Sequence, residues 1–186
     1  LICMQERGQV AIFVIVALVI VGIIVVIFAF KNFSLGSVID PTIQPVYDYV
    51  DECTKSIAID GLYVNGQSGG YYDVPNTKNE NNVPYYVLNK NVKIPEKRVI
   101  ESELGKYISK NLDSCTGNFT ELRQFRISKG RIKPSVNIEN EKIIINLDYP
   151  LTIKKSDTVW EVKEFKNIRV LASYGLLSSV ASEIAN

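Results

Sequence analysis

The sequence contains no histidine, and this absence argues against several kinds of catalytic and metal site. A serine hydrolase of the usual type needs an imidazole as its general base, and a zinc site with few cysteines needs histidine to complete its ligands. The string Gly66-Gln67-Ser68-Gly69-Gly70 matches the G-x-S-x-G pattern of hydrolases. Without a base for Ser68, we interpret its glycines as turn or packing residues. We expect no enzymatic activity, no catalytic residue, no metal site and no cofactor.

An excess of one charge is also missing. The chain has 21 Lys and Arg against 20 Asp and Glu, which gives a formal net charge of +1. A protein that binds a polyanion needs a basic face, and no basic cluster stands out along the chain. Nucleic acid is therefore not an expected partner.

The chain does contain a long apolar stretch, residues 9–30, with the sequence QVAIFVIVALVIVGIIVVIFAF and no charge. As an α-helix it would extend about 33 Å, and the hydrocarbon core of a bilayer is roughly 30 Å thick. The alternatives are a buried core helix and a removable secretory signal. The stretch exceeds the roughly 7 to 15 residues of a secretory apolar region, and bulky Phe28 and Phe30 stand where a cleavage site needs small side chains. We expect residues 9–30 to form a transmembrane helix in the lipid bilayer.

A short polar leader, residues 1–8, ends in Arg7-Gly8 directly before the apolar stretch. It resembles the class III signal of archaeal type IV pilins and archaellins, in which a basic residue and Gly precede the cut and Gln often begins the mature chain. The resemblance implies that a prepilin-type peptidase cleaves between Gly8 and Gln9 and leaves the apolar helix on the mature protein. Phe13 departs from the bacterial pilin pattern, which has Glu at the fifth mature position.

A looser likeness extends to uncharacterised archaeal surface proteins. It is carried by the Arg-Gly-Gln start, a Cys-bearing helix, the Gln-x-Gly-Gly segment at residues 67–70 and the DYPLTIKK strand at residues 148–155. The likeness implies a location at the cell surface and indicates nothing about an activity.

The composition changes after the apolar stretch. Residues 31–40 contain Ser, Gly and Asp ahead of Pro41 and predict a short tether, which leaves residues 41–186 as one domain of ordinary size. A pilin-like leader implies that this domain lies outside the cell, attached by a single-pass helix to the cell membrane. Asn118 begins the sequon Asn-Phe-Thr and is a possible glycosylation site there; a second sequon begins at Asn32.

Apolar residues at intervals of three and four predict two helices in the domain. The first covers about residues 41–61 and the second about residues 95–112. A third helix, without a stop signal, is predicted at residues 176–184. The apolar positions of the first two are Ile43, Val46, Tyr47, Val50, Cys53, Ile57, Ala58, Ile100, Leu104, Tyr107, Ile108, Leu112 and Cys115.

Three cysteines are present, and Cys3 lies before the predicted cleavage point. Cys53 and Cys115 remain, each on the apolar side of its helix. A disulfide between them would close a loop of about 60 residues and stabilise the fold by roughly 4 kcal/mol in the chain-entropy model. It would also fit an oxidising compartment. Two buried thiols are the alternative.

Four tyrosines flank the Asn-rich stretch NTKNENN between the two helices. We predict a β-ribbon formed by residues 70–74 and 83–87, with the Asn-rich stretch as its turn. The tyrosines are a possible binding surface, because a phenol ring offers an apolar face and a polar tip. The alternative is cross-strand packing of aromatic rings. These residues are Tyr71, Tyr72, Tyr85 and Tyr86.

Alternation of apolar and polar residues predicts strands in the last third of the chain. Every odd position from Ile143 to Ile153 is apolar, and shorter alternations precede and follow it. Pro134 and Pro150 indicate an edge strand or bulges. We therefore predict an α+β fold, with helices on one face of an antiparallel meander of three or four strands.

Two classes of function remain open. The first is a structural protein, a pilin-like subunit or cell-surface component whose apolar helix stays in lipid or packs into a filament by self-assembly. The second is an anchored accessory module whose outer domain binds a ligand or another surface protein. The leader favours the first class. The tether favours the second, because pilins generally continue their first helix into the soluble part.

Overall fold

The computed structural model describes residues 6–33, 39–76, 78–81, 83–88, 91–92 and 94–173. The chain divides into two compact units, residues 1–40 and residues 41–186. Residues 34–38 of the predicted tether and the predicted helix at residues 176–184 lie outside the described residues.

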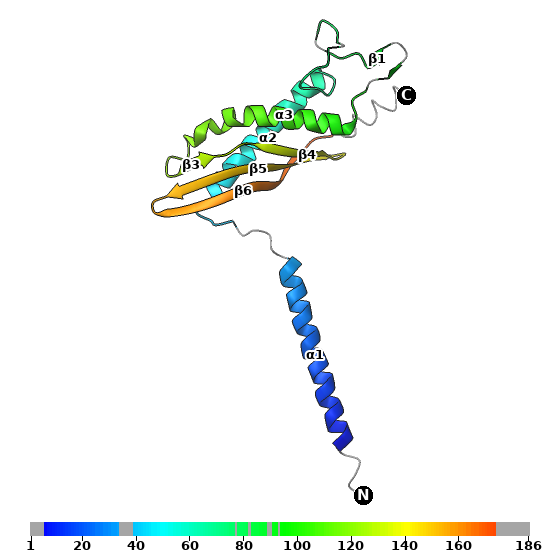
Figure 1. Ribbon diagram of the computed structural model, residues 1–186, viewed down its shortest axis with the longest axis vertical. Coiled ribbons are helices and arrows are strands. Elements are labelled where there is room, and N and C mark those ends of the chain that lie inside the picture. Colours follow the sequence, from blue (N-terminus) through cyan, green and yellow to red (C-terminus); the bar gives the residue numbers. More distant parts are fainter. Residues whose placement is uncertain are drawn as a thin grey trace. The chain divides into compact units, whose positions relative to one another are not determined.

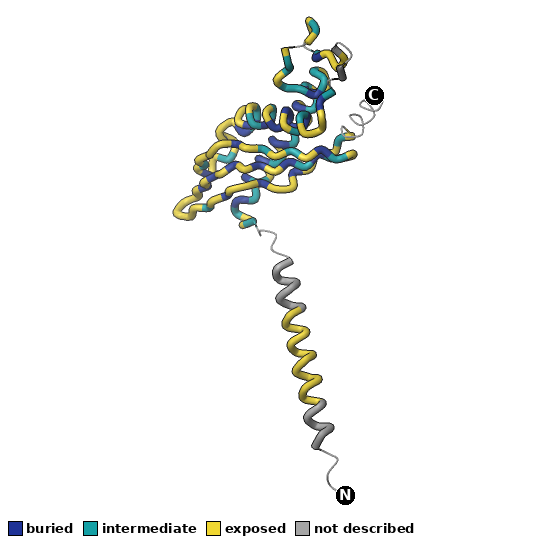
Figure 2. The backbone as a smooth tube through the Cα atoms, turned by 45° about the vertical axis from the view of Figure 1, so that its right-hand side comes forward, coloured by how far each residue is buried: buried dark blue, intermediate teal, exposed yellow. Residues whose placement is uncertain are grey.

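The first unit contains helix α1 (Glu6–Phe33), 28 residues long (Figure 1). The predicted cleavage positions Gly8 and Gln9 lie in its first turns, and its end at Phe33 makes the start of the predicted tether helical. Side chains are described for residues 12–25 of α1, and all of them are exposed (Figure 2). Within the described part of the chain, no helix is at once long enough and apolar enough to cross a bilayer.

The second unit is α+β, as predicted: two α-helices pack on one antiparallel sheet. Strands β5 (Lys142–Lys155) and β6 (Thr158–Leu171) form a long hairpin. Strands β3 (Arg126–Lys129) and β4 (Lys133–Ile138) follow one another along the other edge of β5. The predicted meander is confirmed for β4, β5 and β6, and β3 extends the line of β4.

The two prolines lie where a strand tolerates the loss of an N–H group. Pro134 is in β4, which pairs with β5 on one side only among the described strands. Pro150 lies in β5 at a register shift between β5 and β6, and its carbonyl accepts a hydrogen bond of 2.7 Å from Gly130 N–H between β3 and β4. The edge strand and the bulge expected from these prolines are both present.

The core lies between the sheet and the helices α2 (Gln44–Gln67) and α3 (Lys97–Thr116). Helix α2 packs on β6 and α3 packs on β4 (Figure 1). The alternation predicted for β5 is confirmed, because all six apolar side chains from Ile143 to Ile153 are buried. Buried and exposed positions alternate along this strand (Figure 2). The helices contribute Val46, Val50, Ala58, Ile100, Leu104, Ile108 and Leu112 to the same core.

Cys53 and Cys115 form a disulfide that joins α2 to α3, with a Cα–Cα distance of 5.7 Å. The predicted pairing is confirmed. Next to it, the hydroxyl of Tyr49 donates to the carbonyl of Cys115 at 3.3 Å. After α3, the 3₁₀ helix η1 (Gly117–Phe119) turns the chain toward β3.

The predicted end of the first helix near Gly61 is wrong. Helix α2 continues to Gln67, and Gly61 is buried inside it against Leu104 and Tyr107 of α3. A glycine at this position resembles a helix stop signal, but Gly61 allows the close approach of two helices. The actual end of α2 is made by Gly69 and Gly70, whose φ values are +65° and +91°.

The predicted β-ribbon is only partly present. Among the described residues, 70–74 form no strand, and the two-residue strands β1 (Val87–Leu88) and β2 (Asn91–Val92) pair with each other. One isolated bridge joins Lys78 to Pro84 across the Asn-rich turn. Residues 72 and 73 instead use their N–H groups to bind the side chain of Glu103 on α3.

Candidate interaction surfaces

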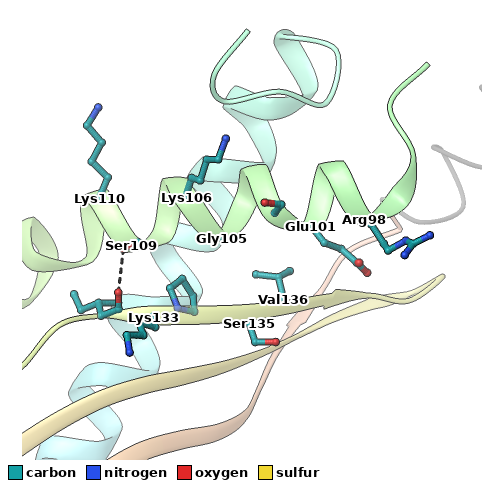
Figure 3. Close-up of a pocket in the computed structure, with 12 residues that line it drawn as sticks. Arg98, Glu101, Gly105, Lys106, Ser109, Lys110, Lys133, Ser135 and Val136 are labelled. Atoms are coloured by element: carbon teal, nitrogen blue, oxygen red, sulfur yellow. Dashed lines mark hydrogen bonds between the residues drawn. The ribbon is translucent and has the colours of Figure 1, made fainter. Parts of the chain in front are cut away.

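A groove of about 770 Å³ lies between α3 and the edge strand β4 (Figure 3). Its floor is formed by small and apolar residues, among them Gly105, Pro134 and Val136. Four cations and one carboxylate are among its lining residues: Arg98, Lys106, Lys110, Lys133 and Glu101. No local pattern in the sequence indicates this groove, because its two walls are about 30 residues apart in the chain.

Two hydrogen bonds fix α3 along the free edge of β4. Ser109 Oγ donates to the carbonyl of Ile132 at 3.1 Å, and the N–H of Ile138 donates to Glu101 Oε1 at 2.9 Å. Since backbone groups alternate in direction along a strand, the N–H of Ile138 and position 134 face the same side, away from β5. A proline at position 134 therefore costs the ladder no hydrogen bond.

The cations at the groove differ in their partners. Lys133 lies 3.8 Å from Asp148, and Arg98 lies 4.0 Å from Glu96. Lys110 forms no ion pair with any described carboxylate, and its Nζ lies 5.3 Å from the centre of the Tyr72 ring. Pairs exposed to this degree contribute about 0 to 1 kcal/mol each, so these cations remain available to an acidic partner.

Lys106 belongs to a separate polar cluster on the upper side of α3. Its Nζ lies 2.6 Å from Glu103 Oε1 and 3.2 Å from Asp73 Oδ2. The hydrogen bond with Glu103 raises the pKa of Lys106. In Figure 3 the side chains of Lys106 and Lys110 point away from β4, and Lys133 lies beside that strand.

Glu103 holds the segment after α2 onto α3. Glu103 is only 6% exposed. Its Oε2 accepts hydrogen bonds from the N–H groups of Tyr72 at 3.0 Å and Asp73 at 2.7 Å. A carboxylate is well suited to two converging N–H donors, because such charge-assisted hydrogen bonds are stronger than neutral ones. The sequence signal was present: Glu103 directly precedes Leu104 in the apolar stripe of α3, where an unpaired charge would be costly.

The four tyrosines predicted as a binding surface lie in two settings. The ring of Tyr72 packs edge-on against Tyr107 of α3, with centroids 5.3 Å apart. Partial burial raises the pKa of Tyr86, and Tyr71 adds to the effect. Tyr85 and Tyr86 are both classed as exposed. At least one of the four is thus used for packing, and their binding role remains a prediction.

Asn118, the predicted glycosylation site, is exposed and has a φ of +54°. It lies between Gly117 and Phe119, which also have positive φ values. Phe119 is buried and its ring lies 6.1 Å from that of Tyr49. The turn therefore buries Phe119 and leaves Asn118 accessible. The side chain of Asn32 lies outside the described residues.

Ser68 lies at the end of α2 and not on a strained strand-to-helix turn. Its φ of −98° and ψ of 23° are unstrained, and the N–H of Gly70 donates to the carbonyl of Asn65 at 2.6 Å. Among the described residues, no three Cys, Asp or Glu side chains are grouped to hold a metal ion. Asp48 pairs with Gln44 and Asp51 with Lys55 on the outer side of α2.

No protein-family model, no curated protein and no solved structure matches this chain.

Proposed function

We propose that the chain is a membrane-anchored extracytoplasmic structural protein, either a pilin-like subunit or a cell-surface component. The observation that carries this proposal is the exposure of α1. Its large apolar side chains between Ile12 and Val25 are from 48% to 72% exposed, the extremes being Ile24 and Phe13. A helix that is apolar on all sides requires lipid or other apolar helices around it.

The helical state of α1 supports a place in lipid. Ile and Val dominate its sequence, and these residues favour strands in water. In a bilayer only a helix satisfies all backbone groups of a single segment. The side chains described for α1 cover only residues 12–25, which is shorter than a membrane span, but its helical backbone covers 28 residues. At the usual rise this backbone extends about 42 Å, against roughly 30 Å for the hydrocarbon core.

The disulfide supports a location of the second unit outside the cytoplasm. Cys53 and Cys115 are joined, and disulfides persist mainly in oxidising compartments. The resemblance of residues 1–8 to a class III signal agrees with this side. On the same basis, a prepilin-type peptidase would remove the leader and the mature chain would begin at Gln9.

The groove between α3 and β4 favours a second candidate function. An anchored accessory module would use such a groove to bind a partner at the cell surface. In that case α1 would only hold the domain at the membrane, and the residues after Phe33 would act as a spacer.

Membrane insertion and processing can be tested on the full-length chain. We expect the protein to float with lipid vesicles, to resist alkaline carbonate extraction and to give a mature mass that begins at Gln9. The variant Gly8→Leu should block processing, whereas Gly22→Leu, at a position with open space around it, should be processed normally. Extraction without detergent would refute the anchor. Normal processing of Gly8→Leu would refute the pilin-like leader.

The two candidate functions differ in the form in which the protein leaves the cell. A filament subunit should pellet as extracellular fibres after mechanical shearing. An anchored module should stay with the membrane fraction until detergent releases it. Electron microscopy of the sheared material, with the intact membranes as control, separates these outcomes.

A further inference from the structure

The outer side of α2 presents an exposed stripe opposite its buried side. We call Asp48, Glu52, Ile59, Asp60 and Tyr63 the α2 stripe; each is exposed, and they recur at helical intervals. Ile59 is 56% exposed and Tyr63 is 68% exposed. Large apolar side chains flanked by carboxylates are typical of a helix that docks on a partner surface.

The groove between α3 and β4 has complementary properties. Its floor at Gly105, Pro134 and Val136 is small and apolar. Of the four cations that line it, Lys106 is held by Glu103 and Asp73. Arg98, Lys110 and Lys133 are left to meet an acidic partner. The carboxylate of Glu101 is already bonded to the N–H of Ile138. A helix that carries Ile59 and Tyr63 together with acidic residues therefore matches both the apolar floor and the cations beside it.

These two surfaces lie on opposite sides of the helical layer. The disulfide and the contact of Gly61 with Leu104 place α3 against the buried side of α2. The α2 stripe therefore faces away from α3, while the groove lies on the side of α3 that packs on β4. Two surfaces on opposite sides of one domain cannot both be used within a single pair of copies.

We propose that copies of this chain associate head to tail, with the α2 stripe of one copy seated in the groove between α3 and β4 of the next. This inference rests on the proposed structural function and names its partner, a second copy of the chain. Such a contact is heterologous and does not close at a dimer, so it extends into an array unless the rotation closes a ring. Anchoring by α1 would favour it further, because anchored domains meet at a raised effective concentration.

Two charge-reversal variants test this contact in the full-length protein. The groove variant is Arg98→Glu with Lys110→Glu, and the stripe variant is Glu52→Lys with Asp60→Lys. All four side chains are exposed, and Glu near the start of α3 suits the helix dipole. Circular dichroism and thermal unfolding of each variant check that the fold is retained.

The measurement is sedimentation velocity in detergent micelles at increasing protein concentration. We expect the wild type to grow beyond the dimer at low salt and to dissociate in about 0.5 M NaCl, where exposed charges are strongly screened. Each variant alone should associate at least about tenfold more weakly than the wild type, a loss of about 1.4 kcal/mol of association free energy. A mixture of the two variants should recover association. The reversed groove of one variant then meets the reversed stripe of the other, and the unchanged stripe of the first meets the unchanged groove of the second.

Recovery on mixing separates this contact from general effects of charge or folding. A wild type that stays monomeric, variants that associate like the wild type, or a mixture that fails to recover would each overturn the proposal. Vesicle flotation of the same proteins tests the membrane anchor separately. A chain that floats but does not associate therefore refutes only the head-to-tail contact.

Discussion

Gly61 of α2 lies so close to Leu104 of α3 that a methyl group on Gly61 would stand 2.7 Å from Leu104 Cδ1. The same methyl group would stand 2.7 Å from Tyr107 Cδ1. Non-bonded carbon atoms have their optimal separation at about 3.5 to 4.0 Å. The two helices can therefore approach this closely only where the residue has no side chain.

The variant Gly61→Ala should destabilise the domain, although alanine is the better helix former. Overpacking of a well-packed interior typically costs about 1 to 3 kcal/mol, which exceeds the roughly 1 kcal/mol gained from helix propensity. Denaturant unfolding measures the difference. Gly66→Ala is the matched control, since it lies in the same helix with nothing within 4 Å of the added methyl group. Equal stability changes in the two variants would contradict this account.

The disulfide between Cys53 and Cys115 should contribute a large share of the stability of the domain. It closes a loop with a sequence separation of 62 residues, and loss of such a bridge from a small domain typically costs about 2 to 5 kcal/mol. We expect Cys53→Ala with Cys115→Ala to lower the free energy of unfolding by that amount. A reductant should bring the wild type toward the variant and leave the variant unchanged. A wild type that is insensitive to full reduction would be inconsistent with this role.

The parts of the fold that were predictable from the sequence depend on local periodicity. The alternation of apolar and polar residues predicted β5. The position of Cys53 and Cys115 on the apolar sides of two helices indicated the disulfide. Pro134 and Pro150 indicated an edge and a bulge because proline lacks an N–H group. Each of these signals can be recognised within one element, or for the cysteines within each of two helices, without knowledge of what packs against it.

The parts that were missed depend on contacts between distant segments. Gly61 resembles a helix stop until α3 is placed beside it. The segment at Tyr72 and Asp73 resembles a strand, but Glu103 supplies a stronger partner for its N–H groups than a second strand does. The groove needs α3 and β4 together, and no local pattern indicates which helix covers the edge of a sheet.

Glu103 should control the local stability of the segment that follows α2. The side chain of Glu103 binds two N–H donors and the ammonium group of Lys106. The variant Glu103→Gln removes the negative charge from all three contacts. The loss of charge-assisted hydrogen bonds at a buried site should cost about 1 to 3 kcal/mol. Hydrogen exchange should show faster exchange at the amides of Tyr72 and Asp73. Glu96→Gln is the control, because its side chain is 77% exposed and pairs only with Arg98 at 4.0 Å; similar exchange in both variants would contradict the role of Glu103.

Tyr149 is fully buried in β5, with its ring 6.4 Å from that of Phe165. Its hydroxyl lies near Asp113 and Thr116 but makes no hydrogen bond of standard geometry among the described residues. Burial raises the pKa of Tyr149 to about 12. At neutral pH, Tyr149→Phe should therefore change the free energy of unfolding by less than about 1 kcal/mol, because it removes a polar group that gains nothing from its site.

At alkaline pH the same variant should become the more stable protein. Between pH 10 and pH 12 the unfolded chain loses the proton of Tyr149 while the folded protein keeps it, so the folded state binds more protons and its stability falls as the pH rises. For Tyr149 the loss is about 2 kcal/mol at pH 12, where the folded protein itself begins to lose the proton, and Phe at this position has no proton to lose. Other groups with raised pKa values, such as Lys106 and Tyr86, titrate in both proteins and cancel in the difference. Denaturant unfolding of the two proteins from pH 8 to pH 12 measures that difference, and parallel curves would show that the Tyr149 hydroxyl reaches solvent.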